Sequence, residues 1–217
     1  MPSSRFRDGA RAALPFAVAV GAFGIPFGLL ARSAGFGSLG AVVMSATTFA
    51  GSAQFAAASI LDAGGAVAAA VVAAILLNAR YAPIGVSVAP VLGGSLWKRF
   101  LLAQLVVDES WAIANRGGRF DRGLLIGAGA VLYVTWVSTT ALGALGAQAI
   151  GDPTALGLDA AFPALFLALL WSQLRERRGI VAAVLGASIA LVLTPFVPLG
   201  LPILAASAGC LVGLRRS

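Results

Sequence analysis

The chain has 217 residues, of which 59% are hydrophobic and 11% are charged, and its mean hydropathy is +0.96. Soluble domains carry roughly 25% charged residues, so the composition excludes a soluble domain and indicates an integral membrane protein. The formal charge of +7 lies in short basic clusters between apolar runs, a pattern of membrane topology rather than of nucleic-acid binding. One cysteine and no histidine exclude an intrachain disulfide, zinc sites and Ser-His catalysis, and no cofactor is expected.

Eight apolar runs predict membrane helices, because about 20 apolar residues cross the hydrocarbon layer of a bilayer. In chain order they cover residues 12–31, 39–61, 66–91, 100–115, 123–150, 159–173, 180–193 and 199–214. The last two runs are split by prolines and could instead form one re-entrant hairpin, which would reduce the count to seven. The expected fold is an all-α, polytopic transmembrane bundle, a single domain over residues 1–217 without an internal repeat.

The basic residues between these runs indicate orientation, because positive charge favours the cytoplasmic side of a membrane. With the N-terminus inside, the inner segments contain eleven basic residues, namely Arg5, Arg7, Arg11, Arg116, Arg119, Arg122, Arg175, Arg177, Arg178, Arg215 and Arg216. The outer segments contain three, namely Arg32, Lys98 and Arg99, while Arg80 lies within the third run. Both termini are therefore predicted to be cytoplasmic.

The centre of the second run, residues 47–55, is rich in small and hydroxyl-bearing side chains. Close helix packing is one interpretation, since small residues let two backbones approach. The other is a helix interrupted near Gly51 and Ser52, with Gln54 facing a cavity and free N–H groups that bind a substrate carboxylate. The residues predicted to bind substrate are Thr48, Gly51, Ser52, Gln54 and Asn78.

Asp108 and Glu109 are predicted to lie near the centre of the bilayer, about 13 Å beyond Arg99 at 1.5 Å per helical residue. Ionised groups are costly at that depth and are usually functional. If the third and fourth runs form an antiparallel pair, Arg80 lies at the same depth and faces the two acids. Two alternatives remain: the fourth run is shallow with both acids near water, or the charges are structural.

The three charged groups predict a proton-coupling site. Two acids and one arginine leave a net charge of −1, so one acid is expected to hold a proton in some states. Arg80 stays protonated and provides a fixed counter-charge. We expect Asp108 to pair with Arg80 and Glu109 to carry the proton, although the reverse assignment remains open.

Four stretches together resemble one family. They are residues 49–55 (FAGSAQF), 78–81 (NARY), 108–112 (DESWA) and 162–166 (FPALF), and the resemblance extends from about Phe6 to Arg178. The chain resembles AzlC-type proteins, the large subunit of branched-chain amino acid exporters. This implies export of hydrophobic amino acids across a bacterial inner (plasma) membrane, together with a small AzlD-type membrane subunit. Where this chain has Tyr81, many relatives have a histidine, so a titrating imidazole is missing here.

A secondary transporter that exports neutral amino acids is the leading functional hypothesis, and it is not an enzyme. One alternative is an intramembrane enzyme that uses Asp108 and Glu109 as acid and base. Such chemistry needs two carboxylates face to face, which adjacent residues on one helix do not provide. The other alternative is a membrane assembly subunit without transport activity. Amino acid efflux from loaded cells distinguishes these classes.

Overall fold

The computed structural model describes residues 2–150, 167, 170–171, 174, 177–197, 201–206 and 208–209. This part is mostly helical, which confirms the predicted all-α class. The elements are α1 (Pro2–Ser33), α2 (Gly37–Thr48), α3 (Gly51–Asp62), α4 (Val67–Asn78), α5 (Tyr81–Leu92), α6 (Leu96–Ala103), α7 (Asp108–Ala114), β1 (Asn115–Arg116), β2 (Arg119–Phe120), α8 (Arg122–Ile150), α10 (Arg177–Leu193) and α11 (Leu201–Ala206). Most of the predicted sixth run, the end of the eighth and the 162–166 stretch lie outside the described residues.

Among the described residues, two helices are long and apolar enough to cross a membrane: Ser4–Ser33 and Arg122–Gly146. A third candidate is the pair α4 and α5, which together cover the predicted third run and meet at a bend of 51°. Pro83 lies in the first turn of α5 and has no N–H to donate to the carbonyl of Ala79, which explains the bend. Eight spans are therefore not confirmed, and the described part holds two or three.

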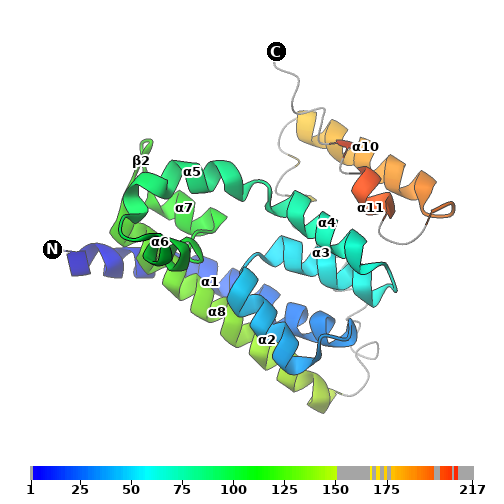
Figure 1. Ribbon diagram of the computed structural model, residues 1–217, viewed down its shortest axis with the longest axis horizontal. Coiled ribbons are helices and arrows are strands. Elements are labelled where there is room, and N and C mark those ends of the chain that lie inside the picture. The colour runs from blue at the N-terminus through cyan, green and yellow to red at the C-terminus, as the bar shows by residue number, and fades with distance from the viewer. Residues whose placement is uncertain are drawn as a thin grey trace.

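The two long helices, α1 and α8, lie side by side and run in the same direction (Figure 1). Gly9 near the start of α1 contacts Leu124 near the start of α8, and Gly28 near the end of α1 contacts Thr140 and Ala144. A Cβ atom at either glycine would overlap the backbone of α8. Small residues therefore allow the close approach of the two helices.

The second predicted run is interrupted, as expected, but it is not one crossing helix: α2 and α3 form a hairpin that reverses at Phe49 and Ala50. Ser38 at the start of α2 donates a hydrogen bond of 3.0 Å to the carbonyl oxygen of Ala144, near the end of α8. The start of α3 contacts Trp136 in the middle of α8, and α3 then packs against the last turns of α1. The hairpin thus enters and leaves at the end of the bundle where α1 ends.

The fourth predicted run is also wrong as one helix, since α6 and α7 form a second hairpin from the opposite end. Leu92 at the end of α5 and Ala114 at the end of α7 share a hydrophobic cluster with Leu124 at the start of α8. Between them, Leu105 at the tip of the hairpin contacts Gly129, further along α8. Both ends of this hairpin therefore lie at the start of α8, and its tip points toward the middle.

This reversal changes the expected position of two basic residues. Gly93 lies just before α6, and a Cβ atom added to it would be 3.5 Å from the guanidinium of Arg122. Lys98 and Arg99 in the first turns of α6 therefore lie at the same end of the molecule as Arg122, whereas the sequence-based topology placed them at opposite ends. The move increases the excess of positive charge at the end where α1 begins.

Between α7 and α8 the predicted basic loop is a two-stranded hairpin, β1 paired antiparallel to β2. Its two turn residues, Gly117 and Gly118, have φ of +62° and +86°, as a tight hairpin turn requires. From α1 to α7 the order is α1, the hairpin of α2 and α3, the bent pair α4 and α5, and the hairpin of α6 and α7 (Figure 1).

Candidate functional site

The side chain of Gln54 stabilises the tip of the first hairpin through hydrogen bonds. This side chain is fully buried; its Oε1 accepts hydrogen bonds from the N–H of Ala50 (3.0 Å) and the indole N–H of Trp136 (3.1 Å). Its Nε2 donates to the hydroxyl of Ser45 at 3.1 Å. The predicted interruption near Gly51 and Ser52 is confirmed, but the prediction that Gln54 faces a cavity is wrong. Its amide oxygen accepts the N–H of Ala50, a backbone group at the break in the helix.

The residue at the reversal, Phe49, has a left-handed backbone with φ of +36°, which is uncommon for a residue other than glycine. Its ring packs edge-on against Tyr133, with ring centroids 5.3 Å apart, and the hydroxyl of Tyr133 donates to the carbonyl of Ala46 at 2.8 Å. Packing against α8 therefore fixes the strained turn. No sequence signal identified Phe49, because left-handed turns usually carry glycine or asparagine.

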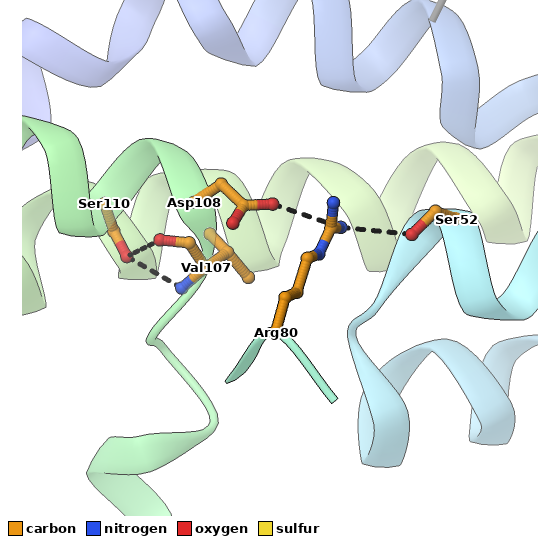
Figure 2. Close-up of polar contacts among 5 residues, drawn as sticks. All are labelled: Ser52, Arg80, Val107, Asp108 and Ser110. Carbon is orange, nitrogen blue, oxygen red and sulfur yellow. Dashed lines mark hydrogen bonds and ion pairs between the residues drawn. The ribbon is translucent and has the colours of Figure 1, made fainter. Parts of the chain in front are cut away.

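The acids lie at the start of α7, not in the middle of an apolar helix as predicted. Val107 is extended, and the hydroxyl of Ser110 accepts its N–H at 3.0 Å, which caps the new helix (Figure 2). The same hydroxyl donates to the carbonyl of Leu105 at 2.8 Å. Asp108 and Glu109 occupy the first turn. The positive end of the helix dipole lies there, so the position stabilises carboxylates within apolar surroundings.

Arg80, at the bend between α4 and α5, bridges the two hairpin tips (Figure 2). One guanidinium nitrogen, Nη2, lies 3.1 Å from Oδ2 of Asp108 and donates to the hydroxyl of Ser52 at 3.0 Å. The predicted pair of Arg80 and Asp108 is thus present, and both side chains are about half exposed (48% and 43%). The guanidinium carbon also lies 5.3 Å from the ring centre of Tyr81.

These charged groups line a cavity of about 750 Å³, which we call the first cavity. Its polar wall consists of Gly51, Ser52, Arg80, Asp108 and Glu109. Glu109 forms no ion pair with a basic side chain in the described part of the chain. The remaining wall is apolar or aromatic and comes mainly from Phe16, Ala19, Val20, Phe23, Phe55, Leu132 and Trp136. The first cavity therefore combines fixed charge with an apolar surface.

A second cavity, of about 720 Å³, lies on the other side of the hairpin tips. Thr48 and Asn78, both predicted to bind substrate, line this second cavity, together with Arg99. The predicted substrate-binding set is therefore divided: Gly51 and Ser52 are in the first cavity, Thr48 and Asn78 are in the second, and Gln54 is in neither. Tyr81, which sequence reasoning noted only as a departure from the histidine of many relatives and did not assign to the site, lines both cavities.

Helices apolar and long enough to cross a membrane, together with interrupted helices whose ends meet around an ion pair, define a helical integral membrane protein. Comparison with known proteins identifies its family. Residues 15–150 match the AzlC protein family, and the chain belongs to it. The branched-chain amino acid transport protein AzlC of Bacillus subtilis is 30% identical over 95% of this chain and 85% of its own length.

Two further relatives are membrane proteins. An uncharacterized membrane protein of Archaeoglobus fulgidus is 32% identical over 87% of this chain and 84% of its own length. The inner membrane protein YgaZ of Escherichia coli is 24% identical over 85% of this chain and 80% of its own length. No solved structure matches the chain. The comparisons assign a membrane location and a role in transport.

Proposed function

We propose that this protein exports branched-chain or similar hydrophobic amino acids, in exchange for protons, through the first cavity. The observation that carries the proposal is the composition of that cavity: an ion pair, an additional carboxylate and a helix start on one wall, and aromatic and aliphatic side chains on the other. A neutral amino acid with an apolar side chain needs both walls. The volume of about 750 Å³ is within the usual range of small-molecule sites.

The substrate carboxylate is best accommodated at the start of α3. The cap residue Ala50 provides no side-chain hydrogen bond to this helix, so the first-turn N–H groups of Gly51 and Ser52 lack the usual capping partner. A helix start attracts anions through these groups and through the helix dipole. Arg80, already bonded to Ser52, adds positive charge beside the same position.

The other two parts of the substrate face different walls. Glu109 lies in the same cavity and is the carboxylate that Arg80 does not pair with, so it is suited to receive the substrate ammonium. A branched apolar side chain then meets Phe55 and Trp136, whose rings are 6.3 Å apart and pack edge to face. Burial of apolar surface there favours leucine-like over polar substrates.

Proton coupling follows from competition at Glu109. Its carboxylate can hold either a proton or the substrate ammonium, while the carboxylate of Asp108 is paired with Arg80 at 3.1 Å. Release of the amino acid outside and uptake of a proton from outside then alternate at one group. The membrane potential and the pH gradient supply the driving force.

Replacement of Glu109 by glutamine tests the coupling. We expect the E109Q protein to fold and bind leucine, but to export it at a rate that no longer responds to an imposed pH gradient. Proteoliposomes loaded with labelled leucine measure this directly, and D62N is the matched control because Asp62 is exposed at the end of α3. Export by E109Q with the normal pH dependence would exclude Glu109 as the coupling group.

We further propose that the chain lies in a bacterial inner membrane with its N-terminus in the cytoplasm and works with a small AzlD-type membrane subunit. The family membership and the inner membrane relative support the location. The partner proposal rests on the family resemblance alone. Full export activity of this chain reconstituted without a second subunit would contradict it.

A further inference from the structure

The two cavities meet the helix breaks through different residues. The first cavity is lined by the first residues of α3 and α7, where helix dipoles are positive. The second is lined by the last residues of three helices, namely Thr48 of α2, Asn78 of α4 and Ala103 of α6. The C-terminal end of a helix carries the negative end of its dipole, so the second cavity favours a cationic group.

Two side chains in the second cavity complement this field. Arg99 on α6 lines it and provides a fixed positive charge. The amide of Asn78 also lines it, and the buried oxygen of that amide has no hydrogen-bond donor among the described residues. An unpaired buried acceptor is costly, and an ammonium group beside Asn78 would supply a donor after a turn of the amide. The remaining wall includes Leu92 and Phe100, which are apolar.

We propose that the second cavity is a second binding site for the transported amino acid, with Arg99 holding the carboxylate and Asn78 with the helix ends holding the ammonium. This inference rests on the proposed function, and it adds a step to the transport path. Phe49 and Tyr81 line both cavities, so they separate the two sites. Because Arg99 lies at the end of the bundle where α1 begins, the second cavity receives substrate from the cytoplasm before the first cavity does.

Cysteine protection tests the site in the full-length chain in liposomes. Cys210, the only cysteine, is replaced by serine, and one cysteine is introduced either at Ala103 in the second cavity or at Ala19 in the first. We expect leucine to slow maleimide labelling at both positions. The R99Q substitution should weaken protection at Ala103 by about tenfold or more, because it removes a charge-assisted hydrogen bond, and leave protection at Ala19 unchanged.

Two controls keep the test decisive. R99K retains the charge and should retain most of the protection at Ala103, which separates binding from folding. Leucine methyl ester has the same side chain and ammonium but no carboxylate, so it should protect Ala103 much less than leucine does. This second arm uses the unaltered Arg99 and does not depend on how any Arg99 variant folds.

The outcomes separate this inference from the proposed function. Leucine protection at Ala19 alone would overturn the second site and leave the first cavity as the substrate site. Protection at neither position would overturn both. Equal protection of Ala103 by leucine and its methyl ester, or undiminished protection in R99Q, would refute the role of Arg99. Arg99-dependent protection at Ala103, together with Arg99-independent protection at Ala19, supports the inference.

Discussion

Replacement of Gln54 by leucine should destabilise the protein strongly, although the residue touches neither cavity. Leucine has a side-chain volume similar to that of glutamine. It leaves the N–H of Ala50 and the indole N–H of Trp136 without an acceptor, and it removes the donor to Ser45. Each stranded buried donor costs about 1–3 kcal/mol. The two stranded donors therefore cost about 2–6 kcal/mol together, and the lower end is expected because hydrogen bonds between membrane helices average nearer 0.6 kcal/mol.

Thermal unfolding in detergent measures this effect. At about 2–4 °C per kcal/mol for a chain of this size, Q54L should lower Tm by at least about 4 °C. Q54E is the matched variant, because a carboxylate still accepts from Ala50 and Trp136, and it should lose less. S52A removes a hydroxyl that faces the first cavity and should affect leucine binding more than stability. Unchanged Tm in Q54L, with weakened leucine binding, would show that Gln54 binds substrate and that the hydrogen-bond argument is wrong.

Two further predictions concern packing and topology. Gly143→Leu should destabilise the protein by more than about 2 kcal/mol, because a Cβ atom at Gly143 overlaps a backbone carbonyl of α1. A Cβ atom at Gly146 has no described atom within 4 Å, so Gly146→Leu should be tolerated. Thermal unfolding compares the two variants. If each hairpin enters and leaves on one side, cysteines at Ser95 and Ser4 should react with an impermeant maleimide from the cytoplasm and one at Ala63 from outside. The eight-span topology gives the reverse for Ser95 and Ala63, so that pattern would refute the hairpins.

The apolar runs predicted the membrane class but could not distinguish a crossing helix from a hairpin. Residues 39–61 and 100–115 are each long enough to suggest one helix, yet a helix of 12 residues such as α2 spans only about 18 Å. The turn between α6 and α7, residues 104–107, contains neither glycine nor proline. The reversal there results from tertiary contacts with α8 and from the Ser110 cap, which a local pattern does not reveal.

The charged residues of the site were predictable from the sequence, whereas its hydroxyl and amide groups were predictable only in part. Charge at membrane depth identified Arg80, Asp108 and Glu109, because few other residues in an apolar chain can form an ion pair. The hydroxyl and amide groups were less specific: Ser52 contacts Arg80, whereas Gln54, two residues later, points into the protein and stabilises the break. On a helix these residues differ in direction by about 200°, and only the structure shows which of them faces the cavity.

Asp108→Asn should leave Arg80 without its carboxylate partner, and the cost can be bounded from the geometry. Breaking a fully buried ion pair costs about 3–5 kcal/mol, whereas an exposed pair contributes less than about 1 kcal/mol. Because both side chains are about half exposed to the cavity, we expect a loss of about 1–3 kcal/mol. The double variant R80Q/D108N removes both charges and should regain most of this stability while it fails to export leucine.

A double-mutant cycle on unfolding free energy measures this coupling, with R80Q as the other single variant. Our reasoning requires a coupling energy above about 0.5 kcal/mol, the limit within which independent sites add. Additive losses would show that the 3.1 Å contact contributes nothing and that Arg80 is held by Ser52 and Tyr81 instead. If the R80Q/D108N variant is stable but inactive, the ion pair is needed for transport and not for folding.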